Sequence, residues 1–148
     1  VNNWECATMG DVKTLVARDE VPAADRWDLS SLYASTDAWE ADFRRFSTEI
    51  DRYAEFQGRL GESPETLAEC LEFDLDIERL AERLGTFAFL KTTEDQADDA
   101  AQSLMGRFQS VAVRAGQLAS FLRPEILAVP EARMTEMLAA PPLADYRL

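Results

Sequence analysis

The residues in this sequence best suited to chemistry are carboxylates spaced four positions apart. Asp74, Glu78 and Glu82 recur at this interval, so on a helix they form one line. Neighbouring carboxylates on an apolar surround would shift each other's pKa values and could share a cation. Alternatively, the line faces an arginine such as Arg107 or Arg114, or borders a strip of solvent. We favour this structural interpretation, because carboxylates alone are a restricted donor set for a metal.

Histidine is absent from all 148 residues. The sequence therefore has no Ser–His or Cys–His pair, no HExxH zinc helix and no imidazole metal ligand. It also has no GxGxxG or GxxxxGK[ST] phosphate loop. Its two cysteines, Cys6 and Cys70, are too few for a disulfide framework or a zinc site, and Cys70 is expected in the core. We predict no catalytic residue, no metal ligand and no cofactor within the chain itself.

Two further sets of side chains have structural and functional interpretations. Arg79 and Arg83 could together bind a carboxylate or phosphate, but their position on a polar helix side favours solvent exposure. Aromatic residues at helical spacing could line a small-molecule pocket. This spacing is more typical of a core, and the residues concerned are Trp39, Phe43, Phe46, Phe73, Phe87 and Phe89.

The overall charge restricts the possible partners. There are 28 acidic and 15 basic residues, a formal net charge of −13. Nucleic acid and anionic membranes would be repelled, because binding to them depends largely on cationic side chains. No apolar run approaches the roughly 20 residues that span a bilayer, and no leader pattern opens the sequence. We therefore expect a cytoplasmic protein without nucleic-acid or membrane partners.

The carboxylate line lies on the most strongly predicted helix of the chain. Ser63 is a good N-cap and Pro64 a good first residue, and no proline follows before Lys91. Both sides of the line are apolar, so this helix must be covered on more than one face. One face is broad and runs from Cys70 to Ala88. The second face carries Leu67, Leu71, Leu75 and Phe89.

Two more long helices flank this central helix in the sequence. The first begins after Ser35 or Thr36, and the third begins near Ala97 or Asp98 and ends at Pro124, with apolar residues alternating at spacings of four and three. Two short helical pieces, 124–128 and 130–140, follow. Short loops between long helices predict antiparallel neighbours. We predict an all-α fold, an antiparallel bundle of three long helices followed by short helices, without a β-sheet.

The length suits one domain with a sizeable core. We predict a poorly defined N-terminal extension at residues 1–20 and a helical domain at 21–143. Residues 144–148 resemble the truncated start of a further element.

Four separated segments resemble the N-terminal region of the oligoendopeptidase F family, in the thimet-oligopeptidase-like zinc metallopeptidases. In order they read VPAADRWDLSSLYASTDAWEADF, FQGRLGESPETLAECLEF, ERLGTFAFLKTTEDQADDAAQSLMGRFQS and LASFLRPEIL. The resemblance covers about residues 21–148. It implies a cytosolic peptidase that cleaves short peptides in a channel, with zinc held by the two histidines of an HExxH motif and a further glutamate. None of these positions occurs here, so no catalytic residue is carried over.

By this resemblance, the chain is a wall or lid of the channel that admits oligopeptides and is inert without a C-terminal catalytic domain. The candidate surface toward that domain or the channel comprises Leu67, Leu71, Asp74, Leu75, Glu78 and Glu82. Two alternatives are a stand-alone all-α protein-interaction module and a carboxylate-based metal protein. An apolar face without its partner also predicts self-association, with a homodimer as the simplest form.

Overall fold

The computed structural model describes residues 20–146, and every regular element in this range is helical. In chain order these elements are η2 (Ala23–Asp25), α1 (Thr36–Glu49), η3 (Ile50–Glu55), α2 (Pro64–Glu94), α3 (Asp99–Ala119), α4 (Leu122–Ala128), α5 (Glu131–Ala139) and η4 (Pro141–Tyr146). The predicted all-α class is confirmed, because no strand occurs between residues 20 and 146.

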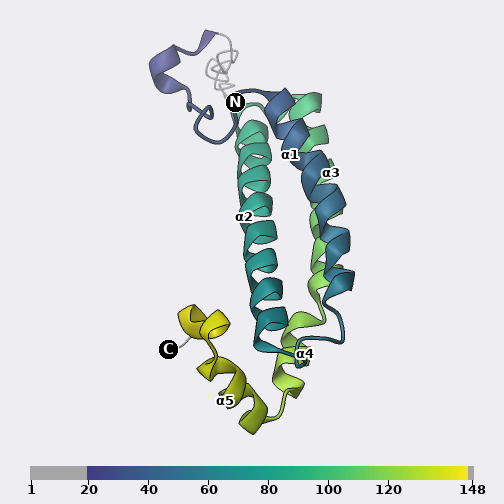
Figure 1. Ribbon diagram of the computed structural model, residues 1–148. Helices are drawn as coiled ribbons and strands as arrows, with labels where there is room; N and C mark the ends of the chain where they lie inside the picture. Colours follow the sequence, from purple (N-terminus) through teal and green to yellow (C-terminus); the bar gives the residue numbers. More distant parts are fainter. Residues whose placement is uncertain (1–19, 147–148) are drawn as a thin grey trace, which may run out of the picture.

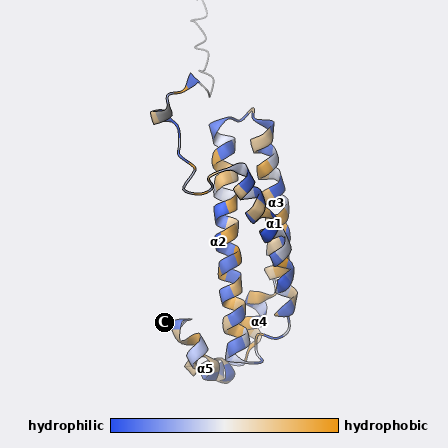
Figure 2. Ribbon diagram, turned by 45° about the horizontal axis from the view of Figure 1, so that its top comes forward, coloured by the Kyte–Doolittle hydropathy of each residue, from blue (hydrophilic) through white to orange (hydrophobic). Residues whose placement is uncertain are grey.

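The three long helices lie side by side, and the chain reverses direction from α1 to α2 and again from α2 to α3 (Figure 1). This arrangement confirms the predicted antiparallel bundle. The short helices α4 and α5 gather at the end of the bundle where α2 begins, and η4 folds back against α2 (Figure 1). The long helices alternate between hydrophobic and hydrophilic residues along their length (Figure 2).

The starts of the helices follow from local capping. The side chain of Ser35 accepts a hydrogen bond from the Ala38 N–H at 3.2 Å, and that of Ser63 accepts one from the Thr66 N–H at 3.1 Å. Asp98 caps α3 in the same way. Each cap satisfies backbone donors that have no partner within the helix, so the predicted starts of α1, α2 and α3 are confirmed.

The predicted end of the third helix at Pro124 is wrong. α3 ends at Ala119, and Pro124 lies in the first turn of α4. A proline is tolerated there because the first-turn N–H groups have no intrahelical acceptor. The change of direction therefore comes before the proline, at Ser120 and Phe121.

The aromatic residues of α1 form the core, as their spacing predicts. Trp39 is completely buried and stacks on Phe43 with ring centroids 4.9 Å apart. The indole N–H of Trp39 donates to the Leu84 carbonyl of α2 at 3.0 Å, which satisfies a donor that would be costly to bury alone. Phe89 is the exception among the aromatic candidates, because it is 54% exposed.

α2 and α3 approach closely at Gly85. A Cβ atom placed on Gly85 would lie 2.7 Å from two ring carbons of Phe108 on α3. The ring of Phe108 in turn stacks toward Phe46 of α1, with centroids 6.3 Å apart. The missing side chain at Gly85 thus makes room for an aromatic contact that joins all three long helices.

Candidate functional site

The six residues of the candidate surface share α2 but occupy two environments. Leu67 is buried, and Leu71 and Asp74 are half-buried. Leu75 is 39% exposed, and both Glu78 and Glu82 are exposed. The first part of the candidate surface is thus covered by this chain, whereas the part from Leu75 onward remains accessible.

The cover over the start of α2 comes from the C-terminal helices. η4 packs against α2, and Leu143 of η4 is completely buried in the same hydrophobic cluster as Leu67. Leu71 packs against this cluster from its edge. Only the accessible part can meet another molecule or another part of a larger protein, so we define the acidic face of α2 as Leu75, Glu78, Glu82 and Phe89.

Asp74 has a partner inside the bundle. The hydroxyl of Tyr53 donates to a carboxylate oxygen of Asp74 at 2.6 Å. Burial, followed by this hydrogen bond, raises the pKa of Tyr53 far above its ordinary value, so the phenol stays protonated. The two side chains border a hollow of about 140 Å³, whose opposite wall is formed by small residues of α3. The hydrogen bond gives Asp74 a structural role, while Glu78 borders the same hollow.

The arginines expected to face the carboxylate line bind elsewhere. Arg107 makes a two-pronged ion pair with Glu40 of α1, at 2.5 and 2.8 Å. Arg114 pairs with Asp51 of η3. Both arginines therefore join α3 to the first helical segment, and the alternative in which one of them pairs with the carboxylate line is wrong.

The pair Arg79 and Arg83 also divides between two roles. Arg79 pairs with Asp76 on its own helix, and both side chains are largely exposed, so this ion pair contributes little to stability. Arg83 instead pairs with Asp42 and donates from Nε to the Tyr33 hydroxyl at 3.0 Å. Arg83 thereby connects α2 to α1 and to the segment before it, so its role is not purely solvated.

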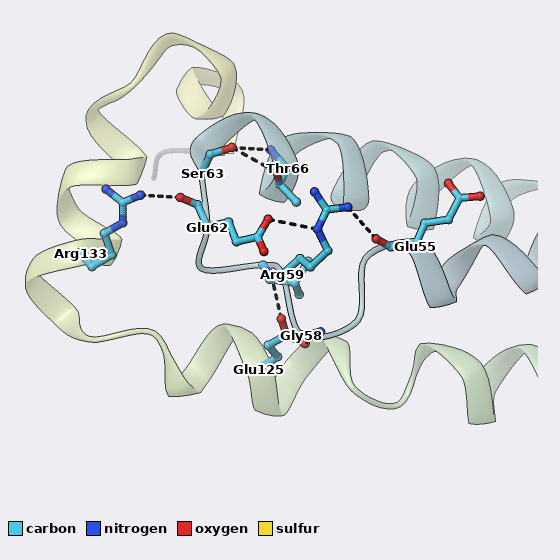
Figure 3. Close-up of polar contacts among 9 residues, drawn as sticks. Glu55, Gly58, Arg59, Glu62, Ser63, Thr66, Glu125 and Arg133 are labelled. Atoms are coloured by element: carbon cyan, nitrogen blue, oxygen red, sulfur yellow. Dashed lines mark hydrogen bonds and ion pairs between the residues drawn. The ribbon is translucent and has the colours of Figure 1, made fainter.

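A carboxylate that the sequence analysis missed organises the loop before α2. Glu125 of α4 accepts hydrogen bonds from the N–H groups of Gly58 at 2.9 Å and Leu60 at 2.7 Å. Arg133 of α5 donates to the Glu62 carbonyl at 2.8 Å (Figure 3). Gly58 has φ +82°, a conformation that favours glycine. No local signal in the sequence links Glu125 to a loop more than 60 residues earlier.

Cys70 is a core residue, as its position on the apolar face predicts. It is completely buried, and burial raises the pKa of its thiol to about 12, with the carboxylates of Asp74 and Glu125 adding to the effect. A thiol that remains protonated in this way is a poor nucleophile and a poor metal ligand.

The described part of the chain offers no ligand set for zinc, the metal that the family resemblance implies. Between residues 20 and 146 no group of three or more Cys, Asp or Glu side chains is arranged to hold a metal ion, and the whole chain lacks histidine. The residues present do not fit a zinc site. Across the same residues, no helix combines the length and apolar character needed to cross a membrane.

Comparisons with known proteins give relatives of one kind. Oligopeptidase PepF from Bacillus subtilis is 30% identical over 122 residues, which are 82% of this chain and 18% of PepF. Oligoendopeptidase F (plasmid) from Lactococcus lactis subsp. cremoris is 29% identical over 113 residues, 76% of this chain and 19% of that protein. No protein-family model matches.

A solved structure shares the fold. The crystal structure of oligoendopeptidase-F from Enterococcus faecium superposes with a TM-score of 0.70 at 24% identity, over 76% of this chain and 22% of that structure. The chain thus spans about a fifth of the length of the relatives it matches.

The all-helical fold and these matches show that the chain is related to a segment, about a fifth of the full length, of proteins in the oligopeptidase class. Within that class, its homologues are named oligopeptidase PepF and oligoendopeptidase F, which confirms the resemblance found in the sequence.

Proposed function

We propose that these residues form a helical wall or lid of an oligoendopeptidase F-type zinc peptidase that hydrolyses short peptides. The observation that carries the proposal is a match extending over 82% of this chain but only 18% of a named oligopeptidase. Because the residues do not fit a zinc site, we assign no step of hydrolysis to them. The zinc and its ligands would belong to the remainder of such a protein. By the same resemblance, we propose that the protein is cytoplasmic.

The acidic face of α2 is the part of this wall that would meet substrate. Its carboxylates Glu78 and Glu82 are exposed and have apolar neighbours in Leu75 and Phe89. Carboxylates beside water attract cationic groups at moderate range, while exposed apolar side chains favour contact with the apolar residues of a peptide. This combination suits weak, sequence-tolerant contact with flexible oligopeptides better than one tightly bound ligand.

A peptide-cleavage assay tests the proposal. The purified 148-residue chain, with zinc added, should not cleave short quenched-fluorescent peptides. The product of the complete reading frame should cleave them, and a zinc chelator should abolish that activity. Robust turnover by the 148-residue chain would refute the inert-wall role, and absence of turnover by the complete product would leave a helical interaction module as the better interpretation.

Charge-reversal variants of the complete product test the acidic face separately. Glu78→Lys combined with Glu82→Lys should raise KM for lysine-rich peptides by about 3- to 10-fold, because two attractive charges become repulsive, while kcat and neutral peptides are little affected. Glu69→Lys combined with Glu72→Lys is the matched control, since it reverses two exposed carboxylates on another side of α2. An equal change in KM from the control would show that only net charge matters.

A further inference from the structure

The outward side of α3 differs from the rest of this acidic protein because it carries no carboxylate. The chain has 28 acidic residues, yet none lies between positions 100 and 124. Uncharged exposed residues recur there at spacings of three and four, which places them in one stripe. We define the outer face of α3 as Ser103, Gly106, Ser110, Val113 and Gln117, together with Ser120, the residue that caps the end of the helix, all exposed.

The arginines of α3 leave this face uncharged. Arg107 is held by Glu40, and its guanidinium lies 4.7 Å from the centre of the Phe43 ring on α1. Arg114 is held by Asp51. Covering the outer face would therefore bury no unpaired arginine charge, so the large free-energy cost of desolvating such a charge would be avoided.

Shape supports the same conclusion as charge. The side chains of the outer face are mostly small, and nothing lies within 4 Å of a Cβ placed on Gly106. Small side chains let two helices approach at the lower end of the usual range, about 8 Å between axes. Val113 lies in the middle of the stripe and is 63% exposed, so it supplies an apolar contact for a neighbouring helix.

We propose that an uncharged helix from the remainder of an oligoendopeptidase F-type protein packs on the outer face of α3. This inference rests on the proposed function, and the matched relatives, more than four times as long as the segment of this chain that they match, provide the polypeptide. The acidic face of α2 is the poorer docking surface, because burying Glu78 and Glu82 would desolvate two carboxylates. A second copy is disfavoured, because each carries a charge of −13 and the two would repel.

Cysteine accessibility tests this docking surface. In a Cys6→Ser background, Ser110→Cys reports on the outer face of α3 and Glu82→Cys on the acidic face of α2, while Cys70 is buried. An uncharged maleimide should label both sites rapidly in the 148-residue chain. In the complete reading-frame product, labelling at Ser110→Cys should slow by more than about tenfold, and labelling at Glu82→Cys should change by less than about twofold.

Each other outcome would overturn the docking proposal. Equally fast labelling of Ser110→Cys in both proteins would show an open face. Protection in the 148-residue chain that grows with concentration would identify a second copy as the occupant, and a reading frame encoding only these residues would remove the partner. Peptide cleavage by the complete product is measured separately, so a failed docking surface is distinguishable from a failed proposed function.

Discussion

Replacing Gly85 by alanine adds one methyl group at the close contact between α2 and α3. The resulting change in the free energy of unfolding tests how much this close packing depends on glycine. Gly85→Ala places a Cβ atom 2.7 Å from two ring carbons of Phe108, whereas carbon atoms pack best about 3.5–4.0 Å apart. The Phe108 ring must therefore retreat by about 1 Å. It is half-buried and stacks toward Phe46, so it cannot simply swing into solvent.

Two opposing terms set the size of the effect. Replacing glycine by alanine in a helix contributes about 1 kcal/mol of stability, and overpacking costs about 1–3 kcal/mol. We expect Gly85→Ala to lower the free energy of unfolding by about 1 kcal/mol on balance. Gly106→Ala is the matched control, because its Cβ meets nothing within 4 Å, and it should raise the free energy of unfolding by up to about 1 kcal/mol.

Urea unfolding followed by circular dichroism measures this difference. The two alanine variants should differ in stability by about 2 kcal/mol, or roughly 4–8 °C in Tm for a chain of this size. In a Phe108→Ala background the clash disappears, so Gly85→Ala should then stabilise the protein. The reasoning is refuted if Gly85→Ala stabilises the wild-type chain as much as Gly106→Ala does.

Three further predictions concern carboxylates and a buried phenol. Glu125→Ala should cost about 1–3 kcal/mol in urea unfolding, because two loop N–H groups lose their acceptor, whereas the exposed control Glu72→Ala should change stability by less than about 0.5 kcal/mol; equal effects would contradict the loop role. Burial raises the pKa of Tyr33 to about 12, so the stability that its protonated phenol provides is complete below the ordinary pKa of 10.0 and is lost as pH rises toward 12. Tyr33→Phe should therefore lose less stability between pH 10 and 12 in urea unfolding. An unchanged slope of stability against pH would contradict this prediction. Arg107 lowers the pKa of Glu40 below its ordinary value of 4.5, so that stability is present above pH 4.5 and is lost as pH falls through the lowered pKa; Glu40→Gln should flatten the acid limb of a titration monitored by unfolding.

The helices could be predicted from the sequence because their signals are local. Ser63 and Pro64 mark the start of α2 within two residues, and the spacing of apolar residues defines its buried side. Such features depend on the 3.6-residue period and on unpaired N–H groups at helix starts. The same reasoning correctly placed Cys70 in the core.

The partners of charged residues could not be predicted in this way. The sequence offers many carboxylates as partners for Arg107, and the rotation of α3 relative to α1, which periodicity does not specify, selects Glu40. Tyr53 reaches Asp74 from η3, a segment that follows α1 and packs against α3. The cover over Leu67 depends on the path of the short helices, and that path is held by tertiary hydrogen bonds that Glu125 accepts and Arg133 donates.

The energetic contrast between α2 and α3 argues for a division of roles between their exposed faces. Covering Glu78 and Glu82 without cationic partners would cost several kcal/mol or force protonation, whereas the outer face of α3 carries only hydroxyl, amide and apolar groups. Amides and hydroxyls can exchange water for hydrogen bonds in an interface at small net cost. A larger protein built around this bundle would therefore bury the α3 side at lower cost and leave the acidic α2 side toward water, where flexible peptides could pass.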